Sequence, residues 1–169
     1  MSNLFSLTKK LSNHKQIIGL LAIYVILSFI TLRSWDQKGI NQVTGDEPHY
    51  LVMSNGIAKY KTLEQTKAYK EEFSTRKIYA PGLASKDETP SPQNTHAVLG
   101  KNGLFNIHNL GLPFILAIPF AIGGVIGAKI FMIGLGGLII FNFWDFASQY
   151  CNNKNMIFTI LVPIVISQP

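Results

Sequence analysis

Long apolar runs alternate with one long polar segment along this chain. The first apolar run is broken only by Ser28 and Thr31 near its end. As a helix it would reach about 24 Å, and the aliphatic stems of the flanking Lys15 and Arg33 can extend it towards the ~30 Å hydrocarbon core of a bilayer. The pattern therefore predicts a transmembrane helix over 16–32.

A cleavable secretory signal is the alternative interpretation of that run, and it would need small residues at a cleavage site just after it. The run ends instead in Leu-Arg-Ser-Trp-Asp, where Trp35 suits the membrane–water interface. The sequence therefore favours an uncleaved anchor. Residues 1–15 are polar and basic and form the N-terminal side of this helix.

Segment 33–109 is polar, and two patterns in it predict short helices. Thr44-x-x-Glu47 is a capping box, in which a hydroxyl and a carboxylate satisfy free backbone donors. Thr62-x-x-Gln65 is a weaker box of the same kind. Short amphipathic helices after a span indicate elements on the membrane surface, with a solvated linker as the alternative for the second helix. On that second helix we expect one face to be formed by Leu63, Thr66, Lys70 and Phe73.

The end of the polar segment predicts a loop and a β-hairpin. Prolines and glycines punctuate 77–93, which is either a loop that covers a substrate or a plain linker. The motif 100–103, Gly-Lys-Asn-Gly, lies between two short apolar runs, and Asn-Gly in that setting is typical of a hairpin turn. His96 precedes the hairpin, and His108 follows it at the edge of the next apolar run.

The segment 110–146 is almost wholly apolar, too long for one span and about right for two. A glycine-rich break ending at Lys129 divides it, so we expect transmembrane helices over 110–126 and 128–146. Small residues in the second of these would let another helix approach closely. A further apolar run, 156–169, stops before it could cross a bilayer, which predicts a fragment or a truncated product.

Together these elements predict an all-α integral membrane protein with three to four transmembrane helices and a long outer loop. Composition agrees, because 47% of the residues are hydrophobic and only 14% are charged, against about 25% in a typical soluble domain. The net charge of +6 is scattered without an Arg-rich run, which excludes nucleic acid as a partner and favours membrane lipid. The single cysteine excludes an internal disulfide.

The distribution of lysines sets the expected topology. Three of them precede the first apolar run, and an excess of Lys and Arg marks the cytoplasmic side of a membrane protein. We therefore expect a cytoplasmic N-terminus, an extracytoplasmic 33–109 loop, and a return of Lys129 to the cytoplasmic side.

Candidate chemistry concentrates in the motif 44–50, Thr-Gly-Asp-Glu-Pro-His-Tyr. Asp46 and Glu47 would point about 100° apart on a helix, so they cannot face one substrate atom as paired glycosidase carboxylates do. If Glu47 closes the capping box, Asp46 is the free acid, and the helix dipole favours its ionised form. An ionised carboxylate is suited to hold a metal ion or to orient an attacking hydroxyl.

His49 follows Asp46 at a spacing that can place both on one helix face. A helix cap beside a solvent-facing histidine is the alternative, and spacing alone favours it. His96 and His108 could each meet Asp46 in space, because the polar loop starts and ends at the membrane, although by spacing alone each is a structural histidine. The sequence contains no nucleophile elbow, phosphate loop or zinc-protease motif.

A first span, the motif 44–51 after it, and the block 100–113 before the next span follow one another in a recognisable order. Those blocks read TGDEPHYL and GKNGLFNIHNLGLP. Over residues 15–145 the chain resembles the N-terminal part of bacterial integral-membrane glycosyltransferases of the C-type superfamily, relatives of the protein mannosyltransferases and of the aminoarabinose transferases of lipid A. Chains of that family are several times longer and have many more spans.

The resemblance implies sugar transfer from a polyprenyl-phosphate donor to a lipid, glycan or protein hydroxyl at the outer face of the bacterial inner membrane. The family's catalytic acid near the end of the first span matches Asp46, with Glu47 as the adjacent candidate. A divalent metal ion often lies near that acid, which makes Asp46 the expected metal ligand. The family's histidine before the second span matches His108.

Substrate binding is expected of His49 and His108, together with a cation that neutralises the donor phosphate. On charge alone, Arg76 or Lys77 is the candidate for that cation. The rival hypothesis is non-enzymatic: an inert truncated membrane protein, or a subunit that pairs with a partner helix through its glycine-rich third helix.

Overall fold

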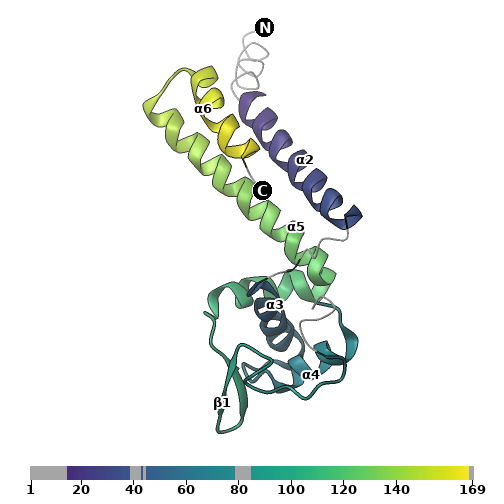
Figure 1. The fold of residues 1–169 in the computed structure, drawn as a ribbon. Coiled ribbons are helices and arrows are strands. Elements are labelled where there is room, and N and C mark those ends of the chain that lie inside the picture. The colour runs from purple at the N-terminus through teal and green to yellow at the C-terminus, as the bar shows by residue number, and fades with distance from the viewer. Residues whose placement is uncertain (1–14, 39–42, 44, 79–84, 168–169) are drawn as a thin grey trace. The chain divides into compact units, whose positions relative to one another are not determined.

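The computed structural model describes residues 15–38, 43, 45–78 and 85–167 (Figure 1). The chain divides into two compact units. One contains 1–40 with 132–169, and the other contains 41–131.

Two helices are long and apolar enough to cross a membrane: α2 (Lys15–Gln37) and α5 (Gly111–Tyr150). A third apolar helix, α6 (Lys154–Ile166), is shorter. Few residues of the two long helices are buried, so most of their apolar side chains face outward, as they would towards lipid rather than inside a soluble core. Three to four transmembrane helices were expected, whereas two helices in the described part of the chain are long and apolar enough to cross a membrane.

The long helix α5 is interrupted at Gly124, whose φ of 58° and ψ of −143° lie outside the helical region. The sequence predicts two helices, 110–126 and 128–146; the structure has a helix on each side of Gly124, so the break comes earlier than expected. Just beyond the break, Gly127 lies directly against the carbonyl oxygen of Pro119, where any Cβ would collide. The chain therefore folds back tightly at Gly124.

In the first unit, α2, α6 and the C-terminal part of α5 pack together (Figure 1). The glycine-rich stretch of α5 takes part in this packing, because Gly136 accommodates the hydroxyl of Tyr24 from α2. Part of the surface predicted to receive a partner helix is thus used within the chain. The buried core of this unit consists of Ile17, Leu20, Tyr24, Ile140, Trp144, Ile157, Leu161 and Val165.

In the second unit, the polar segment folds into α3 (Glu47–Asn55), the π-helix η1 (Gly56–Tyr60) and α4 (Thr66–Thr75). Pro48 stands in the first turn of α3, where a missing N–H removes no helical hydrogen bond. These helices share one apolar core with the first part of α5. Its fully buried members are Val52, Ala68, Tyr69 and Phe73.

Helix α4 differs from its prediction in both start and orientation. The hydroxyl of Thr62 accepts a hydrogen bond from the N–H of Glu64, whose carboxylate in turn accepts one from the N–H of Thr66. These side-chain bonds hold the chain in turns, so the helix begins at Thr66 rather than near Thr62. The prediction of one face shared by Leu63 and Lys70 is also wrong. The side that the helix buries consists of Ala68, Tyr69, Glu72 and Phe73.

The predicted hairpin is confirmed, with β1 (Ala97–Gly100) paired antiparallel to β2 (Gly103–Asn106) around a two-residue turn. Glu64 fixes the hairpin to the start of α4, because its carboxylate accepts a hydrogen bond of 3.2 Å from the N–H of Leu104. The same carboxylate lies against Gly103, whose φ of 133° favours glycine and where a Cβ would collide. The hairpin is therefore held in one position against α4.

Candidate metal centre

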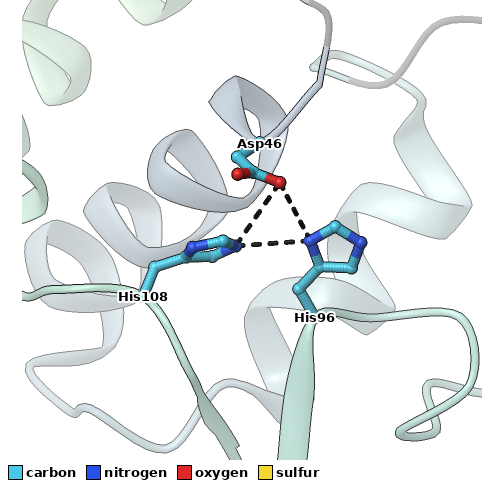
Figure 2. Close-up of side chains that lie close together, drawn as sticks. All are labelled: Asp46, His96 and His108. Carbon is cyan, nitrogen blue, oxygen red and sulfur yellow. Dashed lines mark hydrogen bonds and ion pairs between the residues drawn. The ribbon is translucent and has the colours of Figure 1, made fainter.

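Asp46 occupies the N-cap position of α3, yet its side chain makes no capping hydrogen bond. Its backbone carbonyl accepts hydrogen bonds from the N–H groups of His49 and Tyr50, at 3.1 and 3.3 Å. Gly45, with a φ of 57°, turns the chain immediately before it. The carboxylate of Asp46 therefore points away from the helix end and is available for other partners (Figure 2).

Those partners are two histidines that flank the hairpin (Figure 2). Oδ1 of Asp46 lies 3.2 Å from Nδ1 of His96 and 3.8 Å from Nε2 of His108. The two ring nitrogens lie 3.3 Å apart. The hairpin causes this approach, because the N–H of Ile107 bonds to the carbonyl of His96 at 3.0 Å and continues the strand pairing beyond β1 and β2.

His49 supports this cluster from behind. It is only 6% exposed, and its ring stacks on that of His96 with centroids 3.9 Å apart. Its Nδ1 lies 2.8 Å from the hydroxyl of Tyr69, which also accepts a hydrogen bond of 3.0 Å from Nδ2 of Asn106. The alternative of a solvent-facing histidine at this position is wrong.

A chain of hydrogen bonds connects His49 with Tyr69 and Asn106. Oδ1 of Asn106 accepts the backbone N–H of His108, so Nδ2 of that amide must be the atom that faces Tyr69. The Tyr69 hydroxyl thus lies in one chain of hydrogen bonds between Nδ2 of Asn106 and Nδ1 of His49. Burial, and after it the neighbouring His96 and His108, lowers the pKa of His49 to about 4, against an opposing effect of Asp46. His49 is therefore neutral at pH 7.

The cluster of Asp46, His96 and His108 fits a divalent transition-metal ion. One ligand atom from each residue lies within 4.8 Å of the other two. Ligands of a tetrahedral zinc ion stand about 3.3 Å apart, given metal–ligand distances near 2.0–2.1 Å. Two imidazoles and one carboxylate suit zinc, manganese, iron or cobalt better than magnesium or calcium.

The exposure of the cluster leaves room for a further ligand. The side chains of Asp46 and His96 are 56% and 51% exposed, whereas that of His108 is 14% exposed. Three protein ligands with an open position are typical of catalytic metal sites, because water or substrate can then bind the metal. The Asn106–Tyr69–His49 network behind the rings would hold the ligands in place, as outer hydrogen-bonding residues do in known metal sites.

The other predicted site residues lie elsewhere in this unit. Glu47 is the first residue of α3, not the third as the capping box requires, and it lies within electrostatic reach of Lys129. Thr44, the other half of that box, lies outside the described residues. Arg76 follows α4 with a left-handed φ of 56°. Lys77 lines a cleft of about 480 Å³ whose lining residues do not include the cluster.

A second cleft adjoins the cluster at His108. It has a volume of about 400 Å³ and combines apolar and amide side chains, among them Phe105 and Asn109. Its full lining is Met53, Leu63, Phe105, Asn106, His108, Asn109 and Leu110. A small molecule with one apolar face and several hydroxyls would match such a wall.

Sequence reasoning did not find the supporting residues Tyr69 and Asn106. Tyr69 belongs to the helix whose buried face was mispredicted, and Asn106 lies in a strand with no pattern that marks it. Only the hairpin motif carried a signal, because it predicts that residues on either side of it approach each other.

Comparison of the chain with known protein families, with curated proteins and with solved structures finds no match.

Proposed function

We propose that this chain carries the outer-face metal centre of a bacterial inner-membrane glycosyltransferase. The observation that supports this proposal best is the convergence of Asp46, His96 and His108 in the polar segment that follows the first membrane-length helix. The donor would be a polyprenyl-phosphate sugar, and the acceptor a hydroxyl of a lipid, glycan or protein.

In the proposed reaction, the acceptor oxygen attacks the anomeric carbon of the sugar. The bond from that carbon to the phosphate oxygen breaks, and the polyprenyl phosphate leaves with the electron pair. A divalent cation held by Asp46, His96 and His108 would offset negative charge on that phosphate. Oδ2 of Asp46 orients the acceptor by accepting a hydrogen bond from its hydroxyl, whose proton passes to this carboxylate or to water.

The cleft beside His108 is the proposed sugar site. The ring of Phe105 offers an apolar surface for one face of a sugar, and the amide of Asn109 can bond to its hydroxyls. The half-buried Arg76 and the exposed Lys77 remain proposed contacts of the donor phosphate, although neither lines this cleft.

The test measures metal binding on the purified chain and sugar transfer in membranes that contain it. Zinc or manganese bound to the purified chain is determined by elemental analysis, and transfer is followed with a radiolabelled polyprenyl-phosphate sugar. We expect Asp46→Ala and His108→Ala each to lower metal affinity at least tenfold and to abolish transfer. Asp36→Ala, which removes an exposed acid near the end of α2, is the matched control and should leave both unchanged.

The two readouts distinguish the parts of the proposal. If metal binding depends on Asp46 and His108 but no sugar is transferred, the chain is a metal-binding membrane protein. That result would contradict the proposed glycosyltransferase activity. Transfer that survives Asp46→Ala would contradict the assigned role of this carboxylate.

A helix-packing subunit is the second candidate function. It is supported by Gly134, which has open space beside it while Gly136 is already occupied by Tyr24. If a partner helix packs there, Gly134→Leu should prevent its copurification from detergent and leave metal binding unchanged. Copurification that survives this substitution contradicts the role.

A further inference from the structure

The two parts of α5 differ in their ability to cross a bilayer. The arm Gly111–Gly123 reaches only about 20 Å at 1.5 Å per residue, whereas the part from Val125 to Tyr150 reaches about 39 Å. The hydrocarbon core is ~30 Å thick. Only the second part is long enough to cross it as a straight helix.

The short arm is folded back on the start of the second part. Gly124 breaks the helix, and the carbonyl of Pro119 meets the backbone at Gly127. Leu116 and Ala128, one on each side of the break, are both buried in the same core. The arm is thus packed against the polar segment's own fold and against the helix that follows.

One face of this arm packs inward, and the other is an exposed apolar ridge. On the inner face, the carbonyl of Pro113 accepts a hydrogen bond of 3.2 Å from the hydroxyl of Ser54 in α3. On the outer face, Ile118 and Ile122 are 71% and 84% exposed. The complete ridge, which contains no charged residue, is Phe114, Ile115, Ile118, Ile122, Ile126 and Ile130.

The last two members of that ridge belong to the part of α5 that is long enough to cross a bilayer. The exposed surface of the short arm is therefore continuous along the chain with the surface that lipid would cover on a transmembrane helix. Acyl chains are the occupant that this continuity favours, because a soluble partner could not cover both.

Contacts within the first unit show in which direction the C-terminal part of α5 runs relative to α2. Nε2 of Gln16, near the start of α2, donates to Oδ1 of Asn155 at 3.2 Å. The middle of α2 meets Gly136 through Tyr24. From Met132 to Tyr150, α5 therefore runs antiparallel to α2, and the turn that contains Cys151 lies at the N-terminal end of α2.

We propose that Gly111–Gly123 does not cross the bilayer but lies in the leaflet beside the 33–109 segment, with its apolar ridge against acyl chains. The chain then crosses only with α2 and with the part of α5 after Gly124. Gly123 and Lys129 stay on the side of the polar segment, and Cys151 returns to the side of the N-terminus. Two separate spans over 110–126 and 128–146 would place each of these on the opposite side.

Two charge observations agree with this arrangement. Lys129 lies within electrostatic reach of Glu47, a residue of the polar segment. Lys154 joins the lysines of the N-terminus on one side, which accords with the excess of positive charge on the cytoplasmic side. The inference depends on membrane insertion and not on the proposed sugar transfer.

Thiol labelling of the full chain in sealed membrane vesicles tests the topology. Cys151 is the only cysteine, so the natural chain reports that turn directly. In a Cys151→Ser background, Gly123→Cys reports the break, and Lys101→Cys in the hairpin turn marks the side of the polar segment. A membrane-impermeant maleimide should label Gly123→Cys and Lys101→Cys from one side, and natural Cys151 only from the other.

The proposal would be overturned if Cys151 and Lys101→Cys were labelled from the same side and Gly123→Cys from the opposite side. Labelling after detergent denaturation confirms that each thiol can react. Lipid contact is tested by a fluorophore on Ile118→Cys, which brominated lipids should quench at least twofold. The same fluorophore on Leu99→Cys, an exposed position of the hairpin, should not be quenched. Equal quenching at Ile118→Cys and Leu99→Cys would contradict the proposed contact with lipid.

Discussion

At the scale of single residues, the cluster depends on the histidine that does not face the open site. His49 is buried and neutral, and it supports the ring of His96 by stacking while its Nδ1 is hydrogen-bonded to the hydroxyl of Tyr69. A charged imidazole there would repel a metal cation bound by the two histidines in front of it. A neutral His49 thus favours the binding of a cation at the outer histidines.

Acidification should therefore destabilise the chain through His49. Its pKa is about 4 in the fold and near 6.5 in the unfolded chain, so the unfolded state binds more protons between these values. Stability is fully present above pH 6.5 and falls as the pH drops towards 4, by about 3 kcal/mol in total. The measurement is thermal unfolding in detergent with a chelator present.

The control for this prediction is His49→Phe, which keeps a ring against His96 but cannot titrate. Its unfolding midpoint should be lower at pH 7, because Tyr69 loses a partner, and should depend less on pH between 6.5 and 4. An unchanged pH dependence in this variant would assign the effect to other groups.

Tyr69→Phe should loosen the metal ligands without removing any of them. The substitution deletes the hydroxyl that joins His49 to Asn106, and buried hydrogen bonds of this kind contribute about 1–2 kcal/mol to stability. We expect a lower unfolding midpoint and about tenfold weaker zinc binding, measured by competition with a chelating dye. A loss as large as that of His108→Ala would mean that the site collapses instead.

The residue scale also shows the limit of the sequence. The sequence predicts Asp46 as the free acid, and its side chain indeed makes no cap. The predicted reason was wrong, because Glu47 is not positioned to close the capping box. His49 was predicted to face solvent or to bind substrate. Its burial was not predictable, because it depends on Tyr69 and His96, which are distant in sequence.

At the scale of elements, local chemistry was predictable and tertiary packing was not. The hairpin follows from its turn residues, and the structure has it at the expected place. Helix α4 was misplaced because Thr62 and Glu64 bind backbone N–H groups through their side chains. Its buried face depends on the core shared with α3 and α5, which periodicity over ten residues cannot reveal.

Gly103→Ala should separate the hairpin from α4. The φ of 133° is strained for alanine, and the new Cβ would meet the Glu64 side chain. We expect a destabilisation of about 1–3 kcal/mol and a loss of metal binding, because the hairpin positions His96 and His108. Gly111→Ala, where nothing lies within 4 Å and φ is not positive, is the control and should change neither. Metal binding that persists in Gly103→Ala would mean that the hairpin does not position the ligands.

At the scale of the whole molecule, hydropathy located the membrane-length segments, while the number of crossings depends on a single backbone break. The sequence marks that break with glycines but does not say whether the chain reverses there. The close approach of the Pro119 carbonyl to Gly127 shows that it does. Length alone could not distinguish a short span from an arm lying in one leaflet.

Packing between α2 and α5 should be sensitive to one glycine in particular. Gly136→Ala would collide with the hydroxyl of Tyr24, whereas Gly134→Ala would enter open space. We expect the first to lower stability by about 1–3 kcal/mol, and the second to have little effect, in thermal unfolding of the detergent-solubilised chain. Because the ring carbon that carries the hydroxyl is also too close, adding Tyr24→Phe to Gly136→Ala should restore stability only in part, and equal effects of the two glycine substitutions would contradict the collision.

The two-residue hairpin turn also determines how distant relatives could be recognised. His96 and His108 are 12 positions apart, and one inserted or deleted residue between them would shift the strand register and turn one ring to the opposite face. Insertions in 77–93 would leave the register untouched. A search for related chains should therefore hold the separation of the two histidines fixed, require an Asp-x-x-His upstream, and allow any length between.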